Sequence, residues 1–255
     1  MTTLGILGGL GPMSSVYFYE LLTAHTRATR DQEHLNILLS SRATTPDRTD
    51  FILGRSQDNP LPVMVEEAGR LERAGADLLV IPCNTAHFFY EGVQDAVSIP
   101  VLNIIRENAA FCRFLGISRV GVLATEGTVL SGAYENALRH LGIDCLTPDA
   151  SGQSVVSHII YDRIKYGLTP DIDAFLAVAD TLFARGCERI LLGCTELSLL
   201  KKHHLSDDRF IDSMEVLALS AIRACGKEAV GFNQDLLLFS SKFHHERNLP
   251  CCSAN

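Results

Sequence analysis

Residues 78–87 read LLVIPCNTAH, an apolar run of strand type that ends at Cys83 and continues into small polar residues. Residues 190–196, ILLGCTE, repeat this pattern around Cys194. Two cysteines therefore hold equivalent positions in two copies of one unit. We expect them to face each other across a cleft and to work as a paired acid and base.

A second correspondence marks the start of each copy. Residues 3–12 (TLGILGGLGP) and residues 119–128 (RVGVLATEGT) share an apolar strand and two glycines in register. Short apolar strands and amphipathic helices alternate after each start, and this order predicts an α/β fold of two similar lobes, each a parallel sheet flanked by helices. Ligands in such folds bind beyond the carboxyl ends of the strands. Both cysteines lie there, so the active site is predicted in the cleft between the lobes.

The repeat also sets the expected domain boundaries. Residues 1–113 should form the first lobe, which carries Cys83, and residues 114–208 the second, which carries Cys194. A C-terminal helix is expected within residues 209–230. Residues 231–255 form a tail whose polar, proline-containing end predicts partial disorder.

The composition excludes several classes of function. The formal net charge of the 255-residue chain is −8, and the sequence has no basic cluster of the kind that binds phosphates, so no nucleic-acid partner is expected. No apolar run is long enough to span a membrane, and the N-terminus lacks the basic start and long apolar segment of a signal peptide. We therefore expect a cytoplasmic protein without a membrane partner.

Eight cysteines without a secretory signal predict reduced thiols rather than disulfides. No Cys-x-x-Cys pair occurs, so we expect no structural zinc and assign no metal site. The cysteines outside the repeat are predicted to be small apolar fillers or residues of the tail: Cys112, Cys145, Cys187, Cys225, Cys251 and Cys252.

A glycine-rich turn, GGLGP at residues 8–12, joins the first predicted strand to the first predicted helix. Backbone N–H groups at a helix N-terminus favour an anion, but glycines suit a tight turn equally well, and the sequence leaves both interpretations open. The dinucleotide fingerprint would need a third glycine where Ser14 stands, and no Gly-Lys-Ser/Thr motif follows. No nucleotide site is predicted.

Four charged or titratable residues near these motifs each have two interpretations. Arg48 lies in a polar turn after a strand, where it could bind a substrate carboxylate or be a solvated surface residue. Lys165 ends a predicted helix over residues 153–165, where a cation is favoured for the helix alone. His87 could be the base for Cys83, although a structural histidine is the preferred interpretation. Glu196 could adjust the ionisation of the Cys194 thiol or bind a substrate ammonium group.

Five motifs in this order resemble the aspartate/glutamate racemase superfamily, and they are most similar to aspartate racemases. They are GGLGPM at residues 8–13, PDRT at 46–49, PCNTAH at 82–87, LATEGT at 123–128 and GCTE at 193–196. The resemblance covers about residues 3–225. It implies two α/β lobes related by a pseudo-twofold, a C-terminal helix that returns to the first lobe, and a racemase that needs no cofactor and is usually a dimer.

The resemblance also assigns individual residues. It places the two catalytic cysteines at Cys83 and Cys194. It implies that Arg48 and Lys165 clamp the side-chain carboxylate of an acidic substrate. The other residues that it implies at the substrate site are Met13, Thr49, Asn84, Thr85, Thr125, Thr128, Thr195 and Glu196. The pattern departs from the family at Leu10 and at the Ser14-Ser15 pair, neither of which touches the chemistry directly.

The chemistry explains why two cysteines are needed. Racemisation removes the α-proton from one face and returns a proton to the other, so one group must be a thiolate while the other is a thiol. A free cysteine has a pKa of about 8.5, and a modest depression makes a useful base near neutral pH.

The predicted function is interconversion of L- and D-aspartate, with glutamate as the other candidate, by a homodimer that uses no cofactor. Two alternatives stay open. One is a decarboxylase or isomerase of a small diacid on the same scaffold, and the other is a catalytically silent amino-acid-binding protein.

Overall fold

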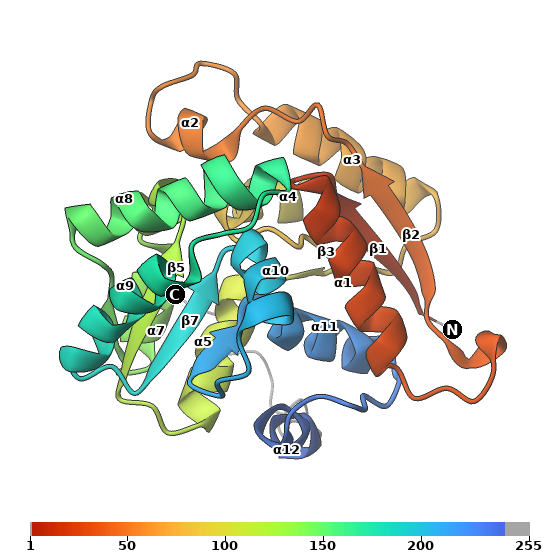
Figure 1. The fold of residues 1–255 in the computed structure, drawn as a ribbon. Coiled ribbons are helices and arrows are strands. Elements are labelled where there is room, and N and C mark those ends of the chain that lie inside the picture. The colour runs from red at the N-terminus through yellow and green to blue at the C-terminus, as the bar shows by residue number, and fades with distance from the viewer. Residues whose placement is uncertain (1, 243–255) are drawn as a thin grey trace.

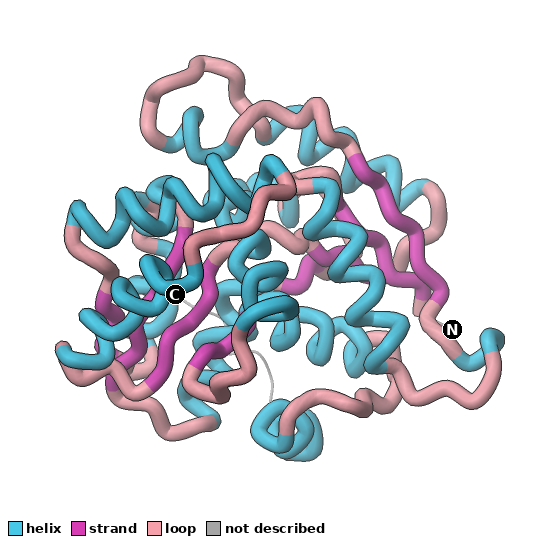
Figure 2. The backbone as a smooth tube through the Cα atoms, in the orientation of Figure 1, coloured by secondary structure: helices cyan, strands magenta, loops and turns pink. Residues whose placement is uncertain are grey.

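The computed structural model describes residues 2–242, which contain two parallel sheets of four strands each (Figures 1 and 2). The strand order is β2-β1-β3-β4 in the first sheet and β6-β5-β7-β8 in the second. The first and third strands of each copy thus lie at the centre, which confirms the predicted α/β fold of two similar lobes. The strands are β1 Thr3–Gly8, β2 Asn36–Ser41, β3 Leu78–Val80, β4 Val101–Leu102, β5 Arg119–Ala124, β6 Asp144–Leu146, β7 Arg189–Gly193 and β8 Phe210–Asp212.

Helices flank both sheets (Figure 1). Those of the first copy are α1 Pro12–His25, α2 Arg48–Ile52, α3 Leu61–Arg73, α4 Tyr90–Gln94 and α5 Ile104–Phe114. The second copy has α6 Glu126–Leu130, α7 Ala133–His140, α8 Ala150–His158, α9 Ile172–Ala184 and α10 Thr195–His204. The chain then forms α11 Ser213–Ala224 and α12 Gln234–Lys242.

Helices pack on both faces of each sheet, because successive side chains of a strand point to opposite faces. Leu4 and Ile6 of β1 belong to one buried cluster with residues of α1, α5 and α11, whereas Leu79 of β3 lies in a second cluster with residues of α3 and α4. The first cluster also contains Val120 and Leu191 of the second sheet. The two lobes therefore share a core, which fixes the cleft between them.

Two glycines show the repeat at atomic scale. A Cβ on Gly5 of β1 would lie 2.5 Å from Leu79 Cδ2, and a Cβ on Gly121 of β5 would lie 2.6 Å from Ile190 Cδ1. Each glycine occupies the third position of the central strand in its copy. Only glycine leaves room there for the neighbouring strand and the covering helix, α3 or α9.

The end of the chain ties the lobes together. β8 pairs with β7 in the second sheet, with Ile190 opposite Phe210. The next helix, α11, packs against α5 and α1 of the first lobe. The predicted tail from residue 231 includes α12, whose Phe239 lies 5.2 Å from the ring of Phe111. The rest of the predicted tail, with Cys251 and Cys252, lies outside the described residues.

Within residues 2–242, no helix is long and apolar enough to cross a membrane.

Candidate active site

The carboxyl ends of β1, β3, β5 and β7 meet at a small, tight cavity between the lobes. The predicted site residues that line it are Arg48, Thr49, Cys83, Asn84, Thr85, Thr125, Lys165, Cys194, Thr195 and Glu196. Leu10, Asp47 and Tyr161 also line it and were not predicted. The repeat therefore brings both cysteines into one site.

Two predicted residues lie outside this inner cavity. Thr128 is buried behind it and is hydrogen-bonded to residues that line it. Met13 is 65% exposed and lines an adjoining outer cavity of about 420 Å³. Arg48, Lys165 and Glu196 border both cavities, so the outer cavity forms the approach to the inner one.

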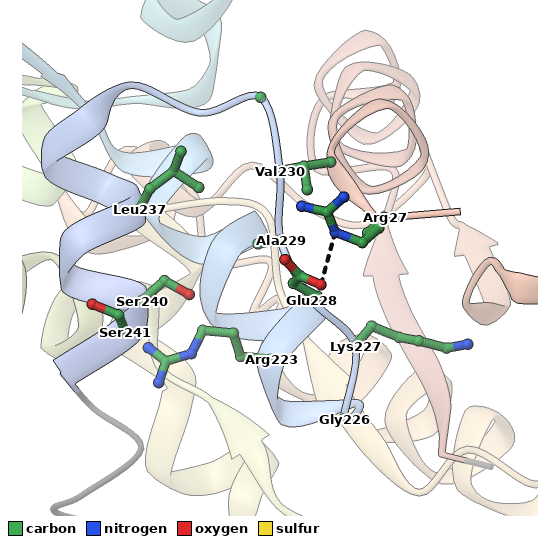
Figure 3. Close-up of a pocket in the computed structure, with 11 residues that line it drawn as sticks. Arg27, Arg223, Gly226, Lys227, Glu228, Ala229, Val230, Leu237, Ser240 and Ser241 are labelled. Carbon is green, nitrogen blue, oxygen red and sulfur yellow. Dashed lines mark ion pairs between the residues drawn. The ribbon is translucent and has the colours of Figure 1, made fainter. Parts of the chain in front are cut away.

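A larger hollow lies elsewhere. Figure 3 shows a cavity of about 800 Å³ beside α11 and α12, where Arg27 forms an ion pair with Glu228 at 2.7 Å. None of the predicted site residues lines it. The volume of a cavity thus does not locate the chemistry in this protein.

Cys83 lies in the short loop that follows β3. Its backbone N–H donates to Ile81 O over 2.8 Å, which turns the chain sharply before the 3-10 helix Thr85–Phe89. The side chain is buried. Burial raises the pKa of the Cys83 thiol, and the positive charge of Arg48 opposes this rise.

Cys194 is the N-cap residue of α10 and is also buried. Its Sγ donates a hydrogen bond to Glu196 Oε2 over 3.0 Å. Burial and the neighbouring Glu196 carboxylate raise the pKa of Cys194 well above its usual range. The two thiols therefore have unequal surroundings, with a cation acting on Cys83 and an anion bonded to Cys194.

Arg48 is buried against backbone carbonyls rather than exposed to solvent. Its Nη2 donates to Leu10 O and its Nη1 to Pro46 O, each over 3.1 Å. Its Nε is buried with no hydrogen-bond partner in the described chain. A buried guanidinium held only by carbonyls keeps its charge uncompensated, so this position favours an anionic ligand.

Lys165 supplies a second cation at the rim. The predicted helical segment over residues 153–165 is confirmed, but it is not a regular α-helix throughout: α8 ends at His158 and is followed by a π-helix, Ile159–Arg163, and a 3-10 turn, Ile164–Tyr166. Lys165 Nζ lies 4.2 Å from the centre of the Tyr161 ring. The π-helix is the physical reason for the change, since its wider turn alters the register of every residue that follows.

Three threonine hydroxyls form a closed triangle beside Cys83. Thr85 Oγ1 lies 2.8 Å from Thr125 Oγ1 and 2.9 Å from Thr128 Oγ1, and the last two lie 2.9 Å apart. Thr125 is also the N-cap of α6. Because each hydroxyl can turn, the triangle can redirect donors towards a carboxylate.

Asn84 is held by side chains that the sequence did not identify. Tyr134 OH donates to Asn84 Oδ1 over 2.6 Å, and Asn84 Nδ2 donates to Ser213 Oγ over 3.0 Å. Tyr134 lies in α7 and Ser213 begins α11, so both partners are far away along the chain. Tyr161, by contrast, could have been predicted from the sequence as a site residue, because it lies four residues before Lys165 in a predicted helix and would therefore be its neighbour on the helix surface.

His87 faces away from the catalytic chemistry. Its Nδ1 donates to Cys83 O over 2.8 Å, and its Nε2 accepts from the Ile104 N–H over 3.1 Å. Burial lowers the pKa of His87 to about 4. The imidazole is neutral with both nitrogens engaged, so His87 holds the backbone of the Cys83 loop and agrees with the structural interpretation.

The glycine-rich turn behaves as a tight turn. Gly9 has φ 83°, and a Cβ there would lie 2.5 Å from Arg42 N. A Cβ on Gly11 would lie 2.8 Å from Glu196 Oε1. The carboxylate beside the N-terminus of α1 is therefore that of Glu196, which occupies the space of an external anion.

The model of the Asp/Glu/hydantoin racemase family matches residues 7–221. The chain belongs to this family. The broad specificity amino-acid racemase RacX of Bacillus subtilis is 28% identical over 223 residues, which cover 86% of this chain and 96% of that protein. A glutamate racemase of Aquifex pyrophilus is 32% identical over 180 residues, 65% of each chain.

Solved structures agree with this assignment. The Picrophilus torridus aspartate racemase superposes with a TM-score of 0.81 at 28% identity, over 94% of this chain and 100% of that one. A glutamate racemase from Francisella tularensis, at 17% identity and a TM-score of 0.63 over 95% of this chain and 93% of that one, shows the same fold. The family and these relatives identify the chain as a racemase of the kind that works without pyridoxal phosphate.

Proposed function

We propose that this enzyme interconverts L- and D-aspartate by proton transfer between Cys83 and Cys194, with glutamate as its second substrate. The observation that carries the proposal is the pair of buried thiols, at equivalent ends of β3 and β7, in one cavity with the uncompensated Arg48. Two cysteines from opposite lobes suit removal and delivery of a proton on opposite faces of Cα.

In the proposed reaction the Cys83 thiolate takes the α-proton, and the electron pair left on Cα delocalises into the α-carboxylate as an enediolate. The Cys194 thiol then gives its proton to the other face of Cα. The product is the opposite enantiomer, with the thiol now at Cys83 and the thiolate at Cys194. The reverse reaction begins from that state with the roles exchanged.

Burial raises the pKa of both thiols, but the charged neighbours make Cys83 easier to deprotonate than Cys194. Arg48 favours the thiolate at Cys83, and the hydrogen bond to Glu196 favours the thiol at Cys194. We assign Glu196 the role of keeping Cys194 protonated until a substrate is bound. We base this role on the hydrogen bond from Cys194 Sγ to Glu196. A carboxylate that served only to bind the substrate ammonium group would not require that hydrogen bond.

Substrate recognition is assigned to the cations and hydroxyls of the cleft. Arg48 and Lys165 would hold the side-chain carboxylate, because both border the cavity and neither forms an ion pair within residues 2–242. The hydroxyls of Thr85 and Thr125, which Thr128 holds in place from behind, would hold the α-carboxylate and stabilise the enediolate. The homodimer expected from the family resemblance and the cytoplasmic location expected from the N-terminal sequence stay predictions.

The test is chiral chromatography of L- and D-aspartate, L- and D-glutamate, and L-methionine as an uncharged comparison, each incubated with the enzyme. We expect racemisation of aspartate from both directions and slower conversion of the uncharged amino acid. Release of carbon dioxide would favour the decarboxylase alternative. Binding of aspartate without conversion would favour the silent binding protein, and either result would refute the proposal.

A further inference from the structure

We infer that Tyr161 sets the length of the acidic substrate, because it fixes the position of Lys165 relative to Arg48. This inference rests on the proposed function, since it concerns the side-chain carboxylate of an acidic amino acid. Tyr161 would act as a positioning residue through Lys165 and as one wall of the cleft.

The Tyr161 side chain is anchored across the cleft. It belongs to the π-helix of the second lobe, yet its hydroxyl donates to Thr49 Oγ1 of the first lobe over 2.7 Å. Thr49 directly follows Arg48 in α2. One hydrogen bond therefore fixes the ring relative to the arginine that would bind the substrate carboxylate.

The ring in turn holds the ammonium group of Lys165. The Nζ–centroid distance is 4.2 Å, within the range of a cation–π interaction. Lys165 itself is exposed and lies in a 3-10 turn that ends at Gly167, whose φ is 69°. The short turn gives Lys165 little support from its own backbone, so the ring is the main restraint on its ammonium group.

The contacts of Arg48 and of Lys165 fix the distance between the guanidinium and the ammonium group. Arg48 is held by the carbonyls of Leu10 and Pro46, and Lys165 is held by Tyr161. The side-chain carboxylate must lie between them while Cα lies between the two thiols. The extra methylene of glutamate would push its side-chain carboxylate outward against Lys165. A pocket that cannot accommodate one methylene discriminates between two such substrates by roughly 10- to 200-fold.

The outer cavity explains why the restraint matters. It has a volume of about 420 Å³, and Lys165 lines it together with Ile164 and Met13. An ammonium group released from the ring could move into this space. The cleft would then accept the longer acid more readily, so the Tyr161 ring is what favours the shorter one.

The experiment compares kcat/KM for aspartate and for glutamate in the wild type and three variants. Tyr161→Leu removes the ring, and Tyr161→Phe keeps the ring but removes the bond to Thr49. Tyr166→Leu is the matched control, because Tyr166 lies on the same segment but is 76% exposed and lines neither cavity. Circular dichroism and thermal unfolding check that each variant is folded.

We expect the wild type to prefer aspartate and Tyr161→Leu to lower this preference at least tenfold, mainly through a lower KM for glutamate. Tyr161→Phe should give a smaller decrease, and Tyr166→Leu none. The inference is overturned if Tyr161→Leu keeps the preference within about twofold of the wild type, if Tyr166→Leu loses it equally, or if the wild type prefers glutamate.

A separate readout distinguishes failure of this inference from failure of the proposed function. If the wild type racemises neither acid, the proposed function fails. Selection by length is then measured as the concentration of aspartate or glutamate that protects Cys83 from iodoacetamide, followed by mass spectrometry. A lower protecting concentration of aspartate, lost in Tyr161→Leu but kept in Tyr166→Leu, supports the inference, and equal protection by both acids overturns it.

Discussion

The thiol of Cys194 donates a hydrogen bond to the carboxylate of Glu196 over 3.0 Å, whereas the strongest charge acting on Cys83 is the Arg48 guanidinium. The repeat places the two cysteines equivalently, but their neighbours make them chemically different. Cys83 is therefore the more readily deprotonated of the two thiols, although burial raises the pKa of both.

Replacing Glu196 by glutamine should remove this difference. The Glu196 carboxylate raises the pKa of Cys194, so its loss lowers that pKa and increases the thiolate fraction at any pH below it. Iodoacetamide should then alkylate Cys194 faster than in the wild type, as peptide mass spectrometry can measure. Racemisation should fall roughly tenfold, since a hydrogen bond to a charged group contributes about 1.5–3 kcal/mol. Glu91→Gln, an exposed partner of Arg106, is the control; unchanged alkylation of Cys194 in Glu196→Gln would contradict the assignment.

Replacing Arg48 by glutamine should affect acidic substrates most. The variant loses the uncompensated charge at the cavity, and truncating one partner of a buried charged pair costs about 2–5 kcal/mol. We expect kcat/KM for aspartate to fall by roughly 100-fold or more, with a much smaller effect on an uncharged amino acid. Arg55→Gln is matched in chemistry and close in sequence, but Arg55 is exposed and paired with Glu126. Equal losses for charged and uncharged substrates would argue against a carboxylate-binding role.

Tyr134→Phe should slow catalysis as well as weaken the fold. The change leaves Asn84 Oδ1 without its donor, at a cost of about 1–3 kcal/mol for an unsatisfied buried group. It also frees the side chain next to Cys83 to rotate, so kcat should fall. Tyr90→Phe is the control, because its hydroxyl donates to Val101 O away from the cavity. Urea unfolding should show similar destabilisation of both variants, and a normal kcat in Tyr134→Phe would show that Tyr134 is only structural.

His87 should make stability depend on pH in a defined window. Its pKa is about 4 in the folded protein, against about 6.5 in an unfolded chain. Between about pH 4 and pH 6.5, His87 is protonated in the unfolded chain but neutral in the folded protein. The free energy of unfolding therefore decreases as the pH falls from about 6.5 to about 4, by up to about 3 kcal/mol. His87→Gln, which keeps a donor and an acceptor, should flatten this part of the curve in urea unfolding measured across pH. An unchanged slope would mean that His87 is not buried in its neutral form.

The sequence predicted those features that depend on pattern. The repeat of strand, cysteine and polar residues around Cys83 and Cys194 led to two parallel sheets and a shared cleft, because strand ends in equivalent units meet at equivalent places. The motifs also identified most of the residues that line the inner cavity. Local patterns of this kind carry enough information because each one lies within a single strand, turn or helix end.

Other features could not be predicted because they depend on contacts between distant segments. Asn84 is held by Tyr134 and Ser213, which are 50 and 129 residues away. The burial of Arg48 depends on the carbonyl of Leu10, which is 38 residues away. The π-helix before Lys165 has no counterpart in the apolar periodicity, which fits a regular helix equally well.

The most direct test of the two-thiol mechanism is the incorporation of deuterium at Cα of L- and D-aspartate in D₂O, followed by proton NMR. It compares the wild type with Cys83→Ser, Cys194→Ser and the filler variant Cys225→Ser. A mechanism with two thiols predicts exchange of both enantiomers by the wild type and Cys225→Ser. Cys83→Ser and Cys194→Ser should each lose racemisation. Any exchange that remains should be limited to one enantiomer in Cys83→Ser and to the opposite enantiomer in Cys194→Ser. Racemisation that persists in Cys83→Ser or Cys194→Ser would contradict a mechanism that needs both thiols.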